Sequence, residues 1–363
     1  MNSSEYLIVG GGVVGAAIGY GLARQGLKCT LLDAHDRDFR AARGNFGLVW
    51  VQSKGIDFPE YARWTRLSAK LWPQLAKELK EVTGIDVQYE KRGGVHYCLD
   101  DHALQQRQTL LQQLQAGSDG DFSYRMLDHN ELRELEPEVG PTIPGGSWSP
   151  HDGHTNPLQL LRALHAGFIN QSGTYLGDHR VEQIERDADG YLLTTAKDRF
   201  HCRNLILACG LDNARLGPMV GLQQSVFPQR GQILVTERLP RLLNHPSNYL
   251  RQTAEGSLQL GDTKEAVGLD DGQDVRAMAA VAERACRIIP RLSQSRIVRG
   301  WGALRVLTKD GYPLYEHKDN AWAFSCHSGV TLAAAHALSL SVQLKNQQLE
   351  PDLKAFTANR FQE

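Results

Sequence analysis

The motif Gly10-x-Gly12-x-x-Gly15, which follows an apolar run at the start of the chain, constrains the fold more than any other stretch. In a strand–turn–helix unit the first glycine makes the turn, and the second allows a pyrophosphate to approach the backbone. The third allows the helix to pack closely on the strand. The helix N-terminus then offers N–H groups and partial positive charge to phosphates. A tight turn without a ligand could use the same glycines, so the motif alone does not identify a nucleotide site.

The segment after the motif favours the nucleotide interpretation. A helix is expected over residues 14–25 and a second strand over 28–33, which ends at Asp33, 18 residues after Gly15. A carboxylate at this place accepts hydrogen bonds from an adenosine ribose. The order strand, glycines, helix, strand and acid therefore predicts a parallel βαβ unit that binds a dinucleotide.

Length and composition limit the class of protein. A chain of 363 residues is too long for one ordinary core and predicts two domains. The formal net charge of −1 gives no broad field for nucleic acid or an anionic membrane. The six cysteines form no CxxC pair, which favours free thiols in a reducing, cytoplasmic compartment and no metal site. The opening residues do not resemble a signal peptide, and the apolar stretch 321–344 is too interrupted by polar residues for a membrane span.

The pattern along the chain predicts an interleaved architecture. A long amphipathic helix is expected near residues 58–80, a strand at 94–99, a helix at 158–169 and a buried strand at 204–210. Alternating strands return from residue 227 to about 299. We expect a cofactor domain in three pieces, 1–84, 151–223 and 300–363, into which a second domain, 85–150 and 224–299, is inserted twice.

A second loop of small residues, Ala42 to Trp50, favours FAD over NAD as the expected cofactor. It follows Asp33 too soon for an ordinary next strand. The chain here resembles the FAD-dependent amine and amino-acid oxidoreductases of the D-amino-acid oxidase and glycine oxidase superfamily, in which such a loop runs along the ribityl chain. Residues 44–52 are especially similar to the flavin-bearing β subunits of opine oxidase and D-hydroxyproline dehydrogenase.

The resemblance covers nearly the whole chain. Its other segments follow in family order: 153–157, Val181, 205–210, 229–232, 302–305 with 309–313, and 327–333. It implies an α/β fold: a Rossmann-like FAD-binding domain of glutathione-reductase-type topology with an inserted antiparallel-sheet substrate domain. Since residues 302–313 contain no cysteine, we expect non-covalent FAD. No second Gly-x-Gly-x-x-Gly is present, so an organic substrate rather than a nicotinamide should reduce the flavin.

The resemblance also implies which residues contact the cofactor. The expected contacts are Gly10, Gly12, Val13, Val14, Gly15, Asp33, Ala34, Arg43, Gly44, Asn45, Phe46, Gly47, Leu48, Val181, Ala208, Cys209, Gly210, Gly302, Arg305, Ser328, Gly329, Val330 and Thr331.

Three residues are candidates for the catalytic site. Flavin chemistry requires that the protein hold the substrate C–H at N5 and fix the carboxylate. Arg305 is the candidate for the carboxylate, since a guanidinium offers two parallel donors, although a surface or ion-paired arginine is the alternative. Tyr249 matches the family's substrate-sheet tyrosine, or is a core residue. His327 contacts substrate or flavin, or is structural.

These observations predict an FAD-dependent amine or amino-acid oxidase or dehydrogenase. The expected substrate is a small amino acid or secondary amine, either a D-amino acid, an imino acid or an opine-like compound, and the product is an imine. An accessory flavoprotein subunit that passes electrons within a complex is the first alternative. A nicotinamide-dependent dehydrogenase is the second. A partner subunit or a separate electron acceptor is compatible with the FAD-dependent enzyme and with the accessory flavoprotein subunit.

Overall fold

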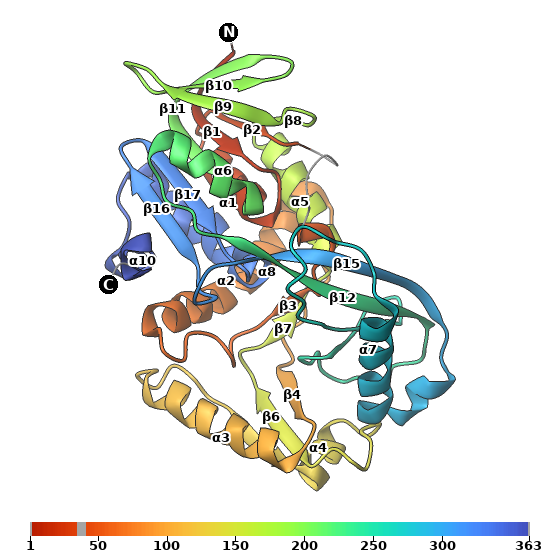
Figure 1. The fold of residues 1–363 in the computed structure, drawn as a ribbon. Helices are drawn as coiled ribbons and strands as arrows, with labels where there is room; N and C mark the ends of the chain where they lie inside the picture. The colour runs from red at the N-terminus through yellow and green to blue at the C-terminus, as the bar shows by residue number, and fades with distance from the viewer. Residues whose placement is uncertain (1, 35–40, 362–363) are drawn as a thin grey trace.

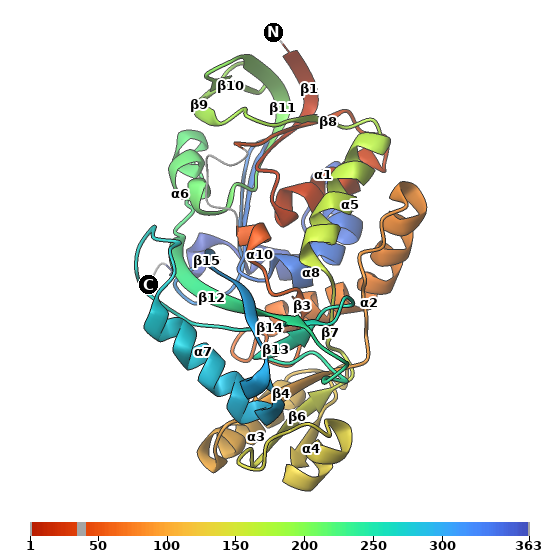
Figure 2. The ribbon, with the colours of Figure 1, turned by 90° about the vertical axis from the view of Figure 1, so that its right-hand side faces the viewer.

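The computed structural model describes residues 2–34 and 41–361, and it arranges them in three tiers. An eight-stranded sheet lies at one end, a four-stranded sheet in the middle and a three-stranded sheet at the other end (Figure 1). The view from the side shows α1 and α5 on one face of the first sheet, and α7 against the middle sheet (Figure 2). The chain visits the first tier at its beginning, middle and end, as its colours in Figure 1 show.

The eight-stranded sheet begins from the glycine-motif strand. Strand β1 (Asn2–Val9) pairs in parallel with β2 (Cys29–Leu32) on one side and β11 (Arg199–Leu207) on the other. The sheet order is β16-β17-β11-β1-β2-β8, with the hairpin β9–β10 added beside β11. The remaining bounds are β8 (Thr174–Leu176), β9 (Val181–Arg186), β10 (Tyr191–Thr195), β16 (Leu314–Lys318) and β17 (Ala321–Ser325). Apolar residues fill the parallel strands because helices cover them.

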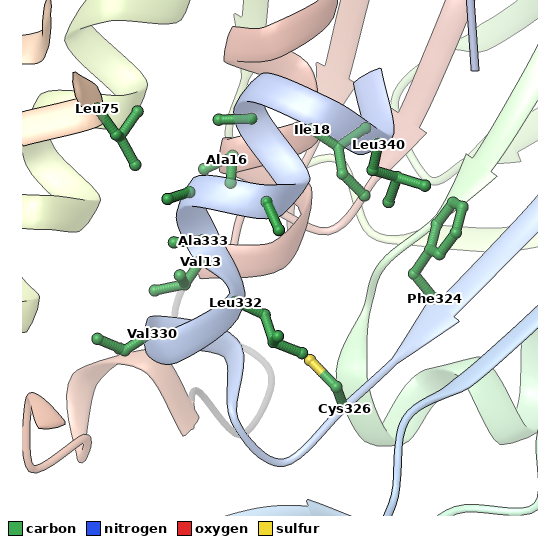
Figure 3. Close-up of a cluster of buried hydrophobic side chains, with 14 of the residues drawn as sticks. Val13, Ala16, Ile18, Leu75, Phe324, Cys326, Val330, Leu332, Ala333 and Leu340 are labelled. Atoms are coloured by element: carbon green, nitrogen blue, oxygen red, sulfur yellow. The ribbon is translucent and has the colours of Figure 1, made fainter. Parts of the chain in front are cut away.

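Helices from distant segments pack together on this sheet. They are α1 (Val13–Ala23), α2 (Pro59–Thr83), α5 (Pro157–Asn170) and α8 (Gly329–Ala335), which continues through His336–Leu340 into α9 (Ser341–Lys345). Figure 3 shows α8 between α1 and Leu75 of α2, with Val13, Ala16, Val330 and Leu332 in the shared core. This packing joins helices from the early, middle and late parts of the chain.

The helices match the sequence expectations in place, with different ends. Helix α2 runs to Thr83 instead of residue 80, because Gly84 at φ 72° adopts the left-handed conformation that ends it. Pro73 lies within it. Helix α1 starts at Val13, directly after its N-cap Gly12.

The middle and lower sheets are antiparallel. The four-stranded sheet has the order β13-β14-β12-β15, and the three-stranded sheet has the order β4-β6-β5. Their bounds are β4 (Gly94–Cys98), β5 (Arg125–Asp128), β6 (Gly145–Ser149), β12 (Phe227–Arg238), β13 (Leu250–Gln252), β14 (Ser257–Leu260) and β15 (Ile297–Leu307). Helices α3 (Asp101–Ala116), α4 (His129–Leu135) and α7 (Val275–Ile288) accompany them. A small pair, β3 (Leu48–Val49) with β7 (Gly153–His154), lies at the junction.

One hydrophobic core joins the two inserted segments. Val95 and Leu127 from the first segment cluster with Leu234, Leu250 and Val281 from the second. The expected domain boundaries stay a prediction, but this shared core is what a twice-inserted domain would have. The remaining short helices are α6 (Asn213–Leu216) and α10 (Pro351–Lys354). Within the described ranges, no helix combines the length and the apolar character that crossing a membrane requires.

Candidate functional site

The three motif glycines have different surroundings. Gly10 adopts φ 105°, which favours glycine, and makes the turn after β1. A Cβ at Gly15 would lie 1.9 Å from the carbonyl oxygen of Gly10, so Gly15 lets α1 pack against the turn. A Cβ at Gly12 would meet nothing within 4 Å, because Gly12 faces an open cleft. Gly12 is therefore the position at which a ligand can approach bare backbone.

Asp33 closes the other side of this turn. Its carboxylate accepts a hydrogen bond from the backbone N–H of Gly11 at 2.6 Å, and its side chain faces the cleft. His165 of α5 places Nε2 2.8 Å from the carbonyl oxygen of Gly11. The carboxyl end of β2 and the turn after β1 are thus held together at one edge of the sheet, where α/β folds bind nucleotides.

The cleft at this edge has an empty volume of about 1010 Å³. Thirteen of the residues expected to contact a cofactor line it: Gly10, Gly12, Val13, Val14, Asp33, Ala34, Asn45, Val181, Ala208, Cys209, Gly210, Gly329 and Val330. They come from the ends of β1, β2 and β11, the start of α1, the segment after the short helix Ala41–Arg43, the start of β9 and the turn into α8. The open cradle at Gly12, the acid at Asp33 and the apolar walls fit an adenine dinucleotide.

A second cleft, of about 990 Å³, continues from the first. The two share Ala41, Asn45, Val306, Cys326, His327 and Val330 in their walls. The second cleft also contains the expected residues Gly44, Phe46, Leu48, Arg305, Ser328 and Thr331. Hydrogen bonds hold the turn between the clefts: Tyr61 donates to Ser328 Oγ at 3.0 Å, and Trp72 Nε1 donates to the carbonyl of Thr331 at 3.0 Å.

Some expected contacts do not line either cleft. Gly15 packs beneath the turn, and Gly47 lies at φ 89° against the carbonyl of Thr155. A Cβ on Gly302 would lie 2.4 Å from the carbonyl oxygen of Gly272, so this glycine faces the loop before α7. Arg43 ends the short helix Ala41–Arg43 and is also absent from both walls. Direct cofactor contact by these four residues therefore has no support from their placement.

Arg305 lies in β15 on the wall of the second cleft. Its Nη2 forms an ion pair with the carboxylate of Asp262, and Nη1 donates to the carbonyl of Arg230 at 3.2 Å. The side chain is 16% exposed. The guanidinium is thus held in place at the cleft wall. It is also ion-paired, which was the expected alternative to a carboxylate-binding role.

Tyr249 and His327, the other catalytic candidates, differ in placement. The guanidinium carbon of Arg284 lies 4.4 Å from the centre of the Tyr249 ring. Tyr249 does not line the second cleft, whereas its neighbour Asn248 does. His327 faces both clefts. Desolvation by the surrounding protein lowers the pKa of His327 well below its usual range, and the charges of Lys54 and Arg305 add to this effect. This shift favours the uncharged form of the imidazole, and the side chain is exposed toward the clefts.

Sequence reasoning did not identify Lys54, which lines the second cleft. Desolvation lowers its pKa from 10.5 to about 8, and the positive charge of Lys264 acts in the same direction. Lys54 follows shortly after the segment 44–52 that carries the resemblance. The lysine itself belongs to no motif, so its position in the fold was the missing information.

A buried polar network supports the segment before Lys54. The side-chain amide of Gln52 donates to Asp152 at 2.5 Å and to the carbonyl of Gly94 at 3.0 Å. Its oxygen accepts from Arg107 at 2.6 Å and from Ser147 at 2.7 Å. Burial raises the pKa of Asp152 to about 7 despite these hydrogen bonds. All hydrogen-bonding capacity of the amide is used, so the backbone at residue 52 is firmly placed.

A dinucleotide cleft that opens into a second, cation-lined cleft beside an antiparallel sheet defines the class as a flavoprotein oxidoreductase. The family described as DAO, FAD dependent oxidoreductase, matches residues 5–341. The chain belongs to this family, and its members are FAD-dependent. The residues described contain no cluster of ligands for a metal ion.

Individual relatives agree with the family assignment. The chain is 40% identical over 365 residues to an opine oxidase subunit of Agrobacterium tumefaciens, covering 99% of this chain and 98% of that one. It is 26% identical to glycine oxidase of Geobacillus kaustophilus over 98% of this chain and 97% of the relative. The crystal structure of the G. kaustophilus glycine oxidase superposes with a TM-score of 0.89 and 24% identity over 98% of both chains. This similarity confirms the predicted fold class.

Proposed function

We propose that this protein oxidises the C–N bond of a small amino acid or secondary amine. The substrate would lose a hydride from its α carbon and the proton of its amine, and the product would be an imine that water can hydrolyse. When bound, FAD would supply the hydride acceptor. The observation that carries the proposal is the continuous cleft, with a dinucleotide cradle at Gly12 and Asp33 at one end and Arg305 at the other.

The first cleft would hold FAD without a covalent bond. Gly12 would give the diphosphate access to the backbone, Asp33 would accept a hydrogen bond from the adenosine ribose, and Val181 would border the adenine. The segment 44–48 and the turn 328–331 would border the ring. The domain boundaries given above are part of this proposal. The boundary at residue 300 would fall within β15, which pairs with β12 of the inserted segment.

The second cleft would position the substrate. Arg305 would bind the α-carboxylate, sharing its guanidinium with Asp262. The cations Arg305, Lys54 and Lys264 disfavour a bound ammonium, since nearby positive charge lowers an amine pKa. The neutral amine is the form that can be oxidised. His327, in its uncharged form, can accept a hydrogen bond from that amine without adding a charge.

The test is anaerobic reduction of the flavin-loaded protein. D-amino acids, N-methyl amino acids and cyclic imino acids are mixed with it without oxygen, and the visible flavin absorbance is followed. N-methylglycine and dimethylamine form a matched pair that differs by a carboxylate. We expect bleaching by at least one amino acid and none by its decarboxylated partner. If no compound in the panel bleaches the flavin, the proposed function is wrong.

A second candidate function rests on the name of a relative. The 40% identical relative is called a subunit of opine oxidase, so this chain could be an electron-transferring subunit that needs a partner. A purified subunit of that kind would remain yellow with every amine and would exchange electrons with its partner.

All six cysteines are free, which supports the proposed cytoplasmic location.

A further inference from the structure

Lys54 occupies a defined place in the substrate cleft. It lies five residues after β3, and its backbone N–H donates to the carbonyl of Val51 at 3.0 Å. The preceding Gln52 is fully buried and held by Asp152, Arg107, Ser147 and Gly94, as described above. Gly55 follows at φ 71°, where a Cβ would lie 2.3 Å from the backbone nitrogen of Ala62. The main chain that presents Lys54 is therefore fixed on both sides.

The ammonium group of Lys54 lacks a counterion among the described residues. Across the part of the chain that the structure describes, Lys54 makes no ion pair or side-chain hydrogen bond. Its charged neighbours include Lys264 and Arg305, which are cations, and Asp152. Asp152 is itself committed to the N–H groups of Val51 and Gln52. A half-buried ammonium that faces a cleft in this way is a position where an anion can bind.

The charges around the cleft point to the kind of anion. Among the described residues that line the second cleft, Lys54 and Arg305 are cations, and Asp262, which is ion-paired with Arg305, is the one carboxylate. At least one positive charge remains in excess. A substrate with a neutral amine and one carboxylate would place that carboxylate at Arg305 and would leave the excess charge of Lys54 unpaired. An amino acid with a second carboxylate would neutralise it.

We propose that Lys54 forms a second carboxylate subsite, so that the preferred substrates are amino acids or secondary amines that carry two carboxylates. This inference rests on the proposed function and narrows its substrate class. Arg305 binds the carboxylate on the carbon that is oxidised. Lys54 binds the second carboxylate across the same cleft. The subsite raises affinity for dicarboxylates and plays no part in removing the hydride or the amine proton.

The test uses ligands that cannot be oxidised. Glutarate has two carboxylates joined by three methylene groups, and butyrate is the same carbon chain with one carboxylate replaced by hydrogen. Each is titrated into the flavin-loaded protein, and binding is followed by calorimetry and by perturbation of the flavin spectrum. Loss of a charge-assisted hydrogen bond changes affinity by about 10- to 100-fold, so glutarate should bind at least about tenfold more tightly than butyrate.

Three variants locate the subsite. In Lys54→Met the preference for glutarate should fall to about threefold or less, because the charged partner is lost. Lys54→Arg should keep it. Lys197→Met, a change at an exposed lysine in the turn between β10 and β11, is the control and should behave as the wild type. Flavin content and thermal melting of each variant establish that it folds.

Several results would overturn the inference. Equal affinity for glutarate and butyrate in the wild type would do so, as would an undiminished preference in Lys54→Met. Loss of preference in Lys264→Met but not in Lys54→Met would place the subsite at the other lysine. A fall in kcat for every substrate in Lys54→Met, with unchanged KM, would make Lys54 a proton-transfer group instead. The binding test needs no turnover. Failure of the anaerobic screen would therefore refute the proposed function, whereas failure of the glutarate test would refute the subsite.

Discussion

Replacing Gly12 with valine should remove FAD without unfolding the protein. A Cβ at this position meets nothing within 4 Å, and the backbone at φ −70° and ψ −178° is open to any residue. The side chain would instead project into the cleft where we place the diphosphate. The neighbouring Gly15→Ala change provides a contrast, since its Cβ would lie 1.9 Å from the carbonyl oxygen of Gly10. That change should destabilise the flavin-free protein itself by about 1–3 kcal/mol.

The size of the effect can be worked out from ligand linkage. At an FAD concentration of 100 times Kd, binding stabilises a folded protein by about 2.7 kcal/mol. With an unfolding entropy of about 2.1 cal/mol/K per residue, 363 residues give about 0.76 kcal/mol/K, so FAD should raise the Tm by about 3–4 °C. Thermal melts with and without FAD should show this shift for the wild type. The Gly12→Val protein should melt like flavin-free wild type and show no shift.

Two controls make this experiment decisive. The flavin content of each purified protein is measured after heat release, and circular dichroism compares the folded state of the flavin-free proteins. Stoichiometric FAD in Gly12→Val would refute the argument, because the diphosphate could not then lie against that backbone. Unfolding of Gly12→Val without FAD would contradict the open space that the structure shows.

The second cleft and its support carry four further predictions. Arg305→Ala should raise the KM for a carboxylated substrate about 30- to 150-fold, equivalent to about 2–3 kcal/mol, with flavin content unchanged; an unchanged KM would remove Arg305 from carboxylate binding. The pKa of Lys54 is lowered to about 8, so its charge is lost as the pH rises through that value, and glutarate affinity should fall there in the wild type but not in Lys54→Met. Since a lowered lysine pKa costs stability at neutral pH, Lys54→Met should also raise the free energy of unfolding at pH 7, and the gain should shrink by pH 10.5; denaturant unfolding at both pH values measures it. Arg107→Leu should lower the free energy of unfolding by about 2–4 kcal/mol, because Ser53 and the carbonyl of Gln52 lose their donor, and an unchanged urea midpoint would contradict this.

Local sequence rules predicted the nucleotide end of the fold. The glycine spacing and Asp33 lie within one βαβ unit, so their relative positions depend on strand and helix geometry that short-range patterns determine. The first cleft accordingly contains most of the expected residues. Helix ends were less accurate, as with α2, because residues near a helix end can continue it until a cap such as Gly84 intervenes.

The substrate end depended on contacts between distant segments. Lys54 comes from the turn that follows β3, Asp262 from the loop after β14, and Arg305 from β15 itself. No spacing rule in the sequence relates these three positions. The resemblance pointed to Tyr249, but its ring packs under Arg284 of α7, a contact that requires the tertiary arrangement of helix and sheet. Gly302, an expected cofactor contact, lies against the loop at residues 271–272. Sequence patterns do not encode which loop will cover a strand.

The most direct test of the central claim is a crystal structure of the protein with FAD and glutarate bound. Our account predicts electron density for the diphosphate beside Gly12, for the ribose beside Asp33, and for the flavin ring where the two clefts meet near His327. One carboxylate of glutarate should lie at Arg305 and the other at Lys54. Density for the nucleotide outside the Gly12 cleft, or for glutarate away from both cations, would contradict the account.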